Sequence, residues 1–274
     1  MLDHNILASR FVSGLPMTQM PVVKKPPQGG SVIECEGAYS ALAPEYEGDD
    51  HSTIAEFHRL TKSEMALNAS ALREAATFFS TGRWLVAGVG PGSNVEDFIS
   101  ATDSSPSRLE ALDISPQMIG LAKAAHLPFS GYNSGDVRDF AAKNPRSWDC
   151  VLALLADPYL DESGLDALCK LVVPGGALVL STPTARWAGL IRPTYMPNTS
   201  SFNLRDGSTR TAPSYCWDLP ELSNAVVKRG FKPVWSRSLS LSATNCHSKI
   251  NAEALKKSKT TILPLLSLAI FQSV

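Results

Sequence analysis

The sequence predicts an α/β protein built on a mostly parallel β-sheet with helices on both faces. Three observations support this fold class. Apolar runs of strand length alternate with amphipathic helical segments over most of the chain. A glycine-rich turn follows the first apolar run, and polar residues follow the next two runs. Such turns are expected where the carboxyl ends of parallel strands meet.

Composition limits the function classes. The chain has 274 residues, of which 44% are hydrophobic and 19% charged, as expected for one large domain with a sizeable core. A formal net charge of −1 argues against a nucleic-acid-binding surface. The five cysteines are dispersed without zinc spacing, which indicates reduced thiols in a cytoplasmic protein without a metal. We expect a monomer or homodimer.

Neither end of the chain predicts a membrane segment. The start lacks a basic stretch followed by an apolar region, so we expect no signal peptide. The apolar run Ile262–Phe271 is too short to span a bilayer and is interrupted by Pro264, so it is interpreted as a buried strand.

The amino-terminal part is expected to precede the sheet. Residues 1–35 are rich in Pro, Gly and Val and predict an extended or disordered arm. Residues 36–80 carry helical periodicity and predict a helical cap, with Gly82 at the position of a helix C-cap. Residues 81–274 would form the main domain.

Strands and helices then alternate along the chain. The expected strands are Trp84–Ala87, Leu109–Ile114, Tyr132–Val137, Asp149–Leu155, Ala177–Thr182, Phe231–Leu241 and Leu265–Gln272. The expected helices are Asn94–Ser100, one that begins at Pro116 after the N-cap Ser115, Arg138–Lys143, Ser163–Leu171, and one that ends near Gly230.

Two further segments carry specific expectations. Residues 185–214 are polar with weak periodicity and predict a long loop, which we interpret as a substrate-side insertion. Asp218 and Glu221 form the pattern of a capping box at the start of the last of those helices.

The glycine loop "GVGPG" indicates a ligand. Gly88, Gly90 and Gly92 lie between a strand and a helix, where a backbone without Cβ atoms can approach a nucleotide-like molecule. A purely structural turn and a nicotinamide or flavin site are alternatives. The third glycine comes one residue earlier than the dinucleotide fingerprint requires.

Two acidic residues follow the next strands. Asp113 ends the second strand, where a carboxylate can accept hydrogen bonds from ribose hydroxyls. Asp136, with Val137, ends the third strand and can accept from an exocyclic adenine amine. Three polar contacts at successive strand ends favour an adenosine-containing cofactor.

With these motifs the sequence resembles the class I S-adenosylmethionine-dependent methyltransferases. "VAGVGPGS" is similar to their first motif, "LDISPQMI" to the second and "SGDV" to the third. The stretch "WDCVLALLADPYLDESGLDALCKLVVPGGALVLSTP" resembles their fourth strand, helix and turn into the fifth strand. The resemblance covers about Tyr39 to Val274. It implies a Rossmann-like seven-stranded sheet, mostly parallel with an antiparallel last strand, and an N-terminal helical lid.

The resemblance also implies the residues that bind S-adenosyl-L-methionine. The glycines would pass beside its methionine part, Asp113 would bind the ribose, and Asp136 and Val137 would hold the adenine edge. The other implied cofactor contacts are the lid residues Tyr39 and Tyr46, the adenine contacts Ile114 and Met118, and Leu154 and Leu155 under the methionyl group. Many members carry an acid at the end of the first strand, whereas this chain has Ala87.

Catalytic and substrate residues are less constrained. His51, His58, Asp157 and Tyr159 are weak candidates for substrate contact or a base, with packing as the alternative. The two histidines lack a further ligand for a metal. A set rich in aromatic residues is a candidate lining for a small organic acceptor: Tyr195, Met196, Phe202, Tyr215 and Trp217. Packing of these residues in the core is the alternative.

The sequence therefore predicts an enzyme that transfers a methyl group from S-adenosylmethionine to O, N or C of a small molecule, with a metabolite of specialised biosynthesis as the expected acceptor. A protein that binds this cofactor without transferring methyl groups is the alternative that Ala87 raises. A nicotinamide-dependent oxidoreductase is a third hypothesis. It is disfavoured because the third glycine of the loop comes one residue too early for the dinucleotide fingerprint.

Overall fold

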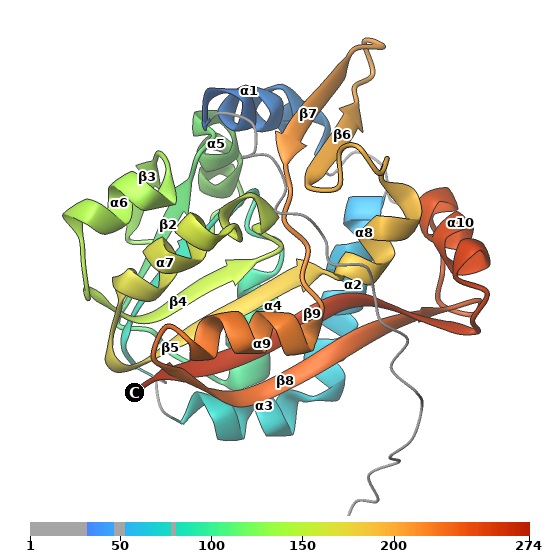
Figure 1. Ribbon diagram of the computed structural model, residues 1–274. Helices are drawn as coiled ribbons and strands as arrows, with labels where there is room; N and C mark the ends of the chain where they lie inside the picture. Colours follow the sequence, from blue (N-terminus) through green and yellow to red (C-terminus); the bar gives the residue numbers. More distant parts are fainter. Residues whose placement is uncertain (1–31, 47–52, 78–80) are drawn as a thin grey trace, which may run out of the picture.

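A computed structural model of the protein describes residues 32–46, 53–77 and 81–274. The arrangement of its helices and strands is drawn in Figure 1. The helices are α1 Val32–Leu42, α2 Thr53–Leu67, α3 Ala69–Ala76, α4 Val95–Thr102, α5 Pro116–Ala124, α6 Val137–Lys143, α7 Glu162–Leu171, α8 Ala185–Ile191, α9 Leu219–Val227 and α10 Lys249–Ser258, with short 3₁₀ turns η1 Ala43–Glu45 and η2 Asp157–Tyr159. The strands are β1 Arg83–Ala87, β2 Arg108–Asp113, β3 Gly131–Ser134, β4 Trp148–Leu154, β5 Val172–Pro183, β6 Thr199–Asn203, β7 Thr209–Pro213, β8 Phe231–Ser242 and β9 Ile262–Ser273.

Seven strands form one sheet in the order β3-β2-β1-β4-β5-β9-β8. The pairs from β3 to β5 are parallel, and β9 runs antiparallel to both β5 and β8. The predicted fold class, including the antiparallel last strand, is therefore confirmed. The chain leaves β1 on one side toward β2 and later returns on the other side with β4. In an open α/β sheet this reversal of strand order opens a crevice at the carboxyl ends of the strands.

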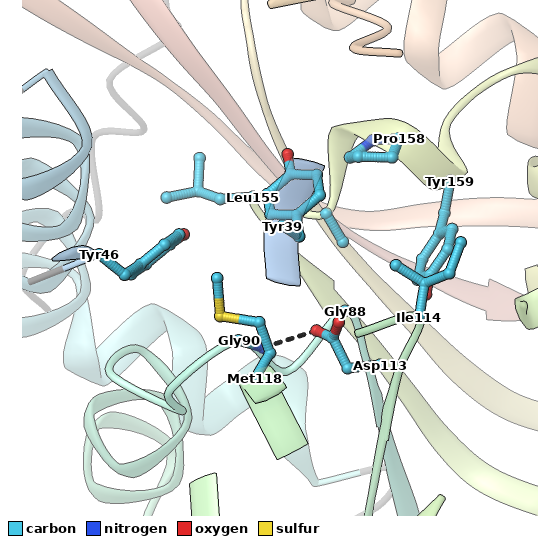
Figure 2. Close-up of a pocket in the computed structure, with 11 residues that line it drawn as sticks. Tyr39, Tyr46, Gly88, Gly90, Asp113, Ile114, Met118, Leu155, Pro158 and Tyr159 are labelled. Carbon is cyan, nitrogen blue, oxygen red and sulfur yellow. Dashed lines mark hydrogen bonds between the residues drawn. The ribbon is translucent and has the colours of Figure 1, made fainter. Parts of the chain in front are cut away.

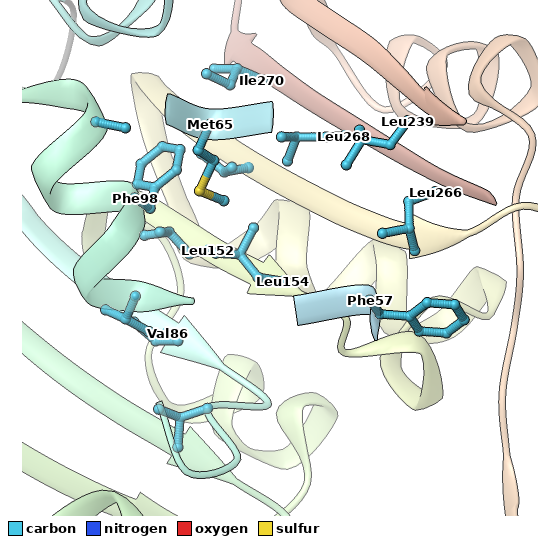
Figure 3. Packing of buried hydrophobic residues seen from close by; sticks show 14 of the residues in the cluster. Phe57, Met65, Val86, Phe98, Leu152, Leu154, Leu239, Leu266, Leu268 and Ile270 are labelled. Carbon is cyan, nitrogen blue, oxygen red and sulfur yellow. The ribbon is translucent and has the colours of Figure 1, made fainter. Parts of the chain in front are cut away.

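The core has a layer on each face of the sheet. Side chains of α2, α4, α5, α8 and α10 pack on one face, and those of α6, α7 and α9 pack on the other. In the first layer, Met65 of α2 and Phe98 of α4 lie over Leu152, and Phe57 reaches Trp187 with ring centroids 5.1 Å apart (Figure 3). Because β4 and β5 are covered on both faces, their sequences are nearly continuous apolar runs.

The caps of several helices explain where they begin. Ser115 is the N-cap of α5, and its hydroxyl accepts a hydrogen bond from Met118 N over 3.2 Å. Thr184 caps α8 in the same way through Trp187 N, at 3.1 Å. Asp136 caps α6 through Arg138 N, at 2.7 Å. These caps fix the helix starts that face the carboxyl ends of the strands.

Several expected boundaries are wrong. Helix α1 begins at Val32, so the expected arm 1–35 overlaps a helix, and residues 1–31 lie outside the described part. Helix α3 ends at Ala76 with Thr77 as C-cap, so Gly82 caps no helix. A Cβ at Gly82 would lie 2.4 Å from Cβ of Asp149, which accounts for the glycine. Strand β3 ends at Ser134, and Val137 already belongs to α6.

The segment 185–214 is not a loop. It contains α8 and the antiparallel hairpin β6–β7, which rises above the sheet beside α1 (Figure 1). The capping box at Asp218 is also wrong. Asp218 is the N-cap residue of α9, but its carboxylate accepts from Arg186 N at 3.2 Å and makes no cap hydrogen bond to the helix.

Among the residues that the structure describes, no helix has both the length and the apolar character to cross a membrane.

Candidate functional site

The glycine loop joins β1 to α4 in a conformation that glycine favours. Gly88, Gly90 and Gly92 have φ of 68°, 52° and 93°. Gly88 N donates to Leu112 O over 2.8 Å, which ties the loop to β2. A Cβ on Gly88 would lie 2.5 Å from Cβ of Ala156, whereas a Cβ on Gly90 would meet nothing within 4 Å. The loop is therefore packed on one side and open at Gly90.

Asp113 ends β2 beside this open position. Its Oδ2 accepts from Gly90 N at 2.9 Å, and its Oδ1 accepts from Ser115 N at 2.9 Å. Burial raises the pKa of this carboxyl to about 6, although backbone hydrogen bonds from Ser115, Gly90 and Ile114 act to lower it. A carboxylate with a second lone pair on each oxygen can still accept two hydroxyl donors from a ligand.

No acid stands at the end of β1. Ala87 and Val86 are both buried, and they pack into the core layers on opposite faces of the sheet. An acidic residue does contact this loop, because Oδ2 of Asp113 accepts from Gly90 N.

Asp136 has a structural partner. Its Oδ2 forms an ion pair with Arg138 Nη1 at 2.9 Å, and Arg138 also pairs with Asp161. Burial by itself lowers the pKa of the Arg138 guanidinium, but the two carboxylates outweigh it and hold the pKa above its usual value. Asp136 thus combines the cap of α6 with an ion-pair network, and it does not line the cavity described next.

A cavity of about 370 Å³ lies at the carboxyl ends of β1, β2 and β4 (Figure 2). Its lining combines the glycine loop, the end of β2 and the start of α5, the turn after β4 and a roof from the amino-terminal helix. The residues are Tyr39, Tyr46, Gly88, Gly90, Asp113, Ile114, Met118, Leu155, Ala156, Pro158 and Tyr159. We call it the loop cavity.

A second cavity of about 500 Å³ adjoins the loop cavity. Tyr39, Tyr46 and Leu155 line both. The remaining lining of this second cavity, which we call the inner cavity, comes from α2, the segment 183–214 and η2: Ile54, Phe57, His58, Asp157, Pro183, Trp187, Arg192, Ser200, Phe202 and Ser214. A ligand in one cavity would therefore be separated from a ligand in the other by a few shared side chains only.

Leu155, between the two cavities, has φ of 57°, a value that a branched side chain rarely adopts. Leu155 N donates to the carbonyl and the hydroxyl of Ser181, at 3.0 and 2.9 Å. These bonds hold a strained residue in place, and strain of this kind gathers at binding sites.

The roof over both cavities is held at two places. Ser40 of α1 donates to Gln117 Oε1 over 2.7 Å at the start of α5. Glu45 accepts from Arg205 N in the β6–β7 hairpin, at 2.9 and 3.1 Å. Tyr39 also contacts Phe202 of the hairpin, with ring centroids 5.5 Å apart. Helix α1, η1 and the hairpin thus close the site together.

A partly buried polar cluster lies on one side of the inner cavity. The Ser214 hydroxyl donates to Asp157 Oδ2 and accepts from Arg192 Nη2. Arg192 further donates to Ser214 O at 2.7 Å, Pro197 O at 3.0 Å and Ser200 Oγ at 3.1 Å. Burial raises the pKa of Asp157, and Ser214 and Arg192 act in the opposite direction.

Two groups near the carboxylates of the site stay protonated. Burial raises the pKa of Cys35 to about 12; Asp157, Asp113 and Asp136 add to this shift, and Arg138 opposes it. Burial also raises the pKa of Tyr39 well above its ordinary value, with Asp157 as the next cause. Both groups are therefore neutral near pH 7.

The sequence-predicted site residues differ in where they lie relative to the two cavities. Eight predicted cofactor residues and Tyr159 line the loop cavity, and His58, Asp157 and Phe202 line the inner one. Gly92, Asp136, Val137 and Leu154, which were also expected to contact the cofactor, line neither cavity. Met196, Tyr215 and Trp217 line neither, and Trp217 Nε1 donates to Leu160 O at 2.8 Å. Tyr195 is 79% exposed, and His51 lies outside the described residues.

Sequence reasoning missed Phe57, Trp187, Arg192, Ser200 and Ser214. The segment 185–214 contains four of them and was a signal for this region, because it was expected to face a substrate. Nothing local in the sequence distinguishes Phe57 and Trp187 from ordinary core residues.

The sequence matches no family model, and no curated protein is similar to it. The fold, however, matches solved structures. A DhpI–SAM–HEP complex aligns with a TM-score of 0.60 and 18% identity over 89% of this chain and 99% of that one. A putative S-adenosylmethionine-dependent methyltransferase from Listeria monocytogenes aligns at 0.53, with 15% identity over 76% and 99%.

The N-methyltransferase NodS from Bradyrhizobium japonicum WM9, in complex with S-adenosyl-L-homocysteine, aligns at 0.52, with 14% identity over 86% of this chain and 98% of that one. The chain therefore has the fold of these methyltransferase structures over most of its length.

Proposed function

We propose that the protein transfers the methyl group of S-adenosylmethionine to a small-molecule acceptor. The observation that carries this proposal is the pair of adjoining cavities at the carboxyl ends of the parallel strands, which share Tyr39, Tyr46 and Leu155. One cavity contains the glycine loop and Asp113, and the other is lined by aromatic and polar side chains. A two-substrate reaction requires adjoining sites of this kind.

The residues of the loop cavity suit the cofactor by their positions and charge. Gly90 offers open space where a Cβ would otherwise stand, and Asp113 offers carboxylate oxygens for the two ribose hydroxyls. The sulfonium and the ammonium group of S-adenosylmethionine are cationic, and the neighbouring carboxylates favour cations. When bound, the cofactor would supply an electrophilic methyl group, and the chain would supply orientation and exclusion of water.

The inner cavity would hold the acceptor. Its lining of aromatic side chains with a few polar groups is typical of pockets for small organic molecules. We also propose a cytoplasmic location, which the free thiols of all five cysteines support.

Isothermal titration calorimetry tests the cofactor class. We expect S-adenosylmethionine and S-adenosylhomocysteine to bind with micromolar affinity or better, and NAD to give no heat of binding. Both sulfur compounds carry the same adenosine group, so the product should bind as well. Tight binding of NAD with no response to either sulfur compound would overturn the proposal in favour of an oxidoreductase.

A further inference from the structure

The polar groups of the inner cavity indicate the chemical class of its ligand. Arg192 uses both terminal nitrogens on Ser214, Ser200 and the carbonyl of Pro197. Four of the five donors of a guanidinium are occupied by these bonds. A carboxylate ligand could not form a two-bond pair with Arg192 without breaking them.

Asp157 is in the opposite situation. Its Oδ2 accepts from the Ser214 hydroxyl. In the described part of the chain no other residue donates to its Oδ1, and Asp157 is a lining residue of the cavity. Asp157 Oδ1 is therefore an open hydrogen-bond acceptor in the inner cavity, and the ligand should carry a hydrogen-bond donor.

The surrounding rings favour a cation over a neutral donor. Tyr39, Tyr46, Phe57, Trp187 and Phe202 all line the inner cavity. The faces of such rings attract an ammonium group electrostatically. The Tyr39 hydroxyl does not compete as an anion, because burial and Asp157 raise its pKa.

We propose that the inner cavity binds an amine attached to an apolar or aromatic body, with the ammonium group on Asp157 Oδ1. This inference rests on the proposed function. It assigns Asp157 as the residue that binds the nitrogen and takes its proton.

The proposed methyl transfer consists of one proton transfer and one displacement at the methyl carbon. The ammonium group gives one proton to Asp157, and the freed nitrogen lone pair attacks the methyl carbon of S-adenosylmethionine. The new C–N bond forms as the C–S bond breaks, and the electron pair of that bond stays on sulfur. The products are a methylated ammonium ion and S-adenosylhomocysteine, and Asp157 then releases its proton to water.

Three probes with one ring system and different tails test the assignment. Tryptamine carries an ammonium group, tryptophol a hydroxyl and indole-3-propionate a carboxylate. Each is titrated by calorimetry into protein saturated with S-adenosylhomocysteine. We expect tryptamine to bind about tenfold or more tightly than either other probe. Tryptamine binding that is absent, or no tighter than that of tryptophol or indole-3-propionate, overturns the assignment.

Two variants locate the charge. Asp157→Asn should weaken tryptamine binding by about tenfold or more and remove the preference among the probes. The exposed Asp139→Asn on α6 makes the same chemical change away from both cavities and should bind the probes like the unchanged protein. Retention of the amine preference in Asp157→Asn contradicts the proposal.

The affinity for S-adenosylhomocysteine is measured first in each variant. If the unchanged protein does not bind S-adenosylhomocysteine, the proposed function is wrong. If it binds S-adenosylhomocysteine but does not prefer the amine probe, this inference alone is wrong. If Asp157→Asn does not fold, the ranking of the three probes in the unchanged protein decides the question.

Discussion

Gly90 donates its backbone N–H to Oδ2 of Asp113 over 2.9 Å, and this bond joins the loop after β1 to the end of β2. The two residues are 23 positions apart in the chain. Both line the loop cavity (Figure 2), so the bond fixes the loop and the acid relative to each other. Preorganisation of this kind reduces the entropy that a ligand loses on binding.

The first prediction concerns the charge of Asp113. We expect Asp113→Asn to weaken S-adenosylhomocysteine binding by about 1–3 kcal/mol, because one acceptor oxygen and the negative charge are lost. Calorimetry measures the change, with Asp139→Asn as the control that should bind normally. Unchanged affinity in Asp113→Asn would mean that this carboxylate does not contact the ribose.

The pH dependence of binding follows from the same residue. Burial raises the pKa of Asp113 to about 6, so the carboxyl becomes protonated as the pH falls through this value. We expect the affinity for S-adenosylhomocysteine to fall between about pH 7.5 and pH 5, because a protonated carboxyl accepts hydroxyl donors less well. In Asp113→Asn this part of the pH profile should disappear. A profile that is identical in both proteins would contradict the assignment.

Asp113 makes the free energy of unfolding depend on pH, with a sign opposite to that of a carboxylate in an ordinary ion pair. The folded protein holds the Asp113 proton more tightly than the unfolded chain, whose pKa is near 3.8. The stabilisation from protonated Asp113 is therefore complete below that value and is lost as the pH rises through about 6. A ligand that donates hydrogen bonds to the ionised carboxylate offsets this loss.

The next prediction concerns the backbone at Gly90. Gly90→Ala should weaken S-adenosylhomocysteine binding by about tenfold or more, because the new Cβ would enter open space beside the ligand. Gly207→Ala is the matched control, since Gly207 also has positive φ and open surroundings but lies in the hairpin turn. Both variants should lose a similar small amount of stability in urea unfolding. Equal affinity in the two variants would show that the ligand does not pass Gly90.

A buried carboxylate outside the cavities is expected to support the fold. Glu56 of α2 is fully buried and accepts from His247 N, from Ser248 N at 3.1 Å and from Asn251 Nδ2. Asn251 in turn accepts from Trp187 Nε1 at 2.8 Å, and Trp187 lines the inner cavity. The network therefore connects the start of α10 with a wall of the proposed acceptor site.

We expect Glu56→Gln to lower the free energy of unfolding by about 1–3 kcal/mol at neutral pH, as measured in urea, because charge-assisted bonds become weaker. Burial by itself raises the pKa of Glu56, but the hydrogen bonds outweigh it and lower the pKa below 4.5. The stabilisation should thus be complete above pH 4.5 and be lost as the pH falls below it. The exposed Glu221→Gln should show no such loss, and an equal change in both variants would contradict the role of Glu56.

The loop cavity contains residues that could be singled out from the sequence because their signals are local. Gly88 and Gly90 lie in the turn after β1, Asp113 is the last residue of β2, and the parallel sheet brings successive strand ends together. The inner cavity could not be predicted in the same way. Its walls come from α2, α8, the hairpin and η2, which meet only through tertiary packing.

The missed elements have physical reasons. The strands β6 and β7 are short and largely exposed, so they lack the alternation of apolar and polar residues that indicates a half-buried strand. Helix α8 has only 7 residues and depends on its Thr184 cap and the burial of Trp187. At Asp218 the carboxylate is used by Arg186 N of α8, a contact that no local pattern reveals.

The most direct test of the central claim is a crystal structure of the protein grown with S-adenosylhomocysteine. We expect difference density in the loop cavity, with both ribose hydroxyls within hydrogen-bond distance of the Asp113 carboxylate and the ligand passing beside Gly90. The sulfur should point toward Leu155 and the inner cavity. Density for the ligand elsewhere, or a ribose that does not contact Asp113, would contradict the account.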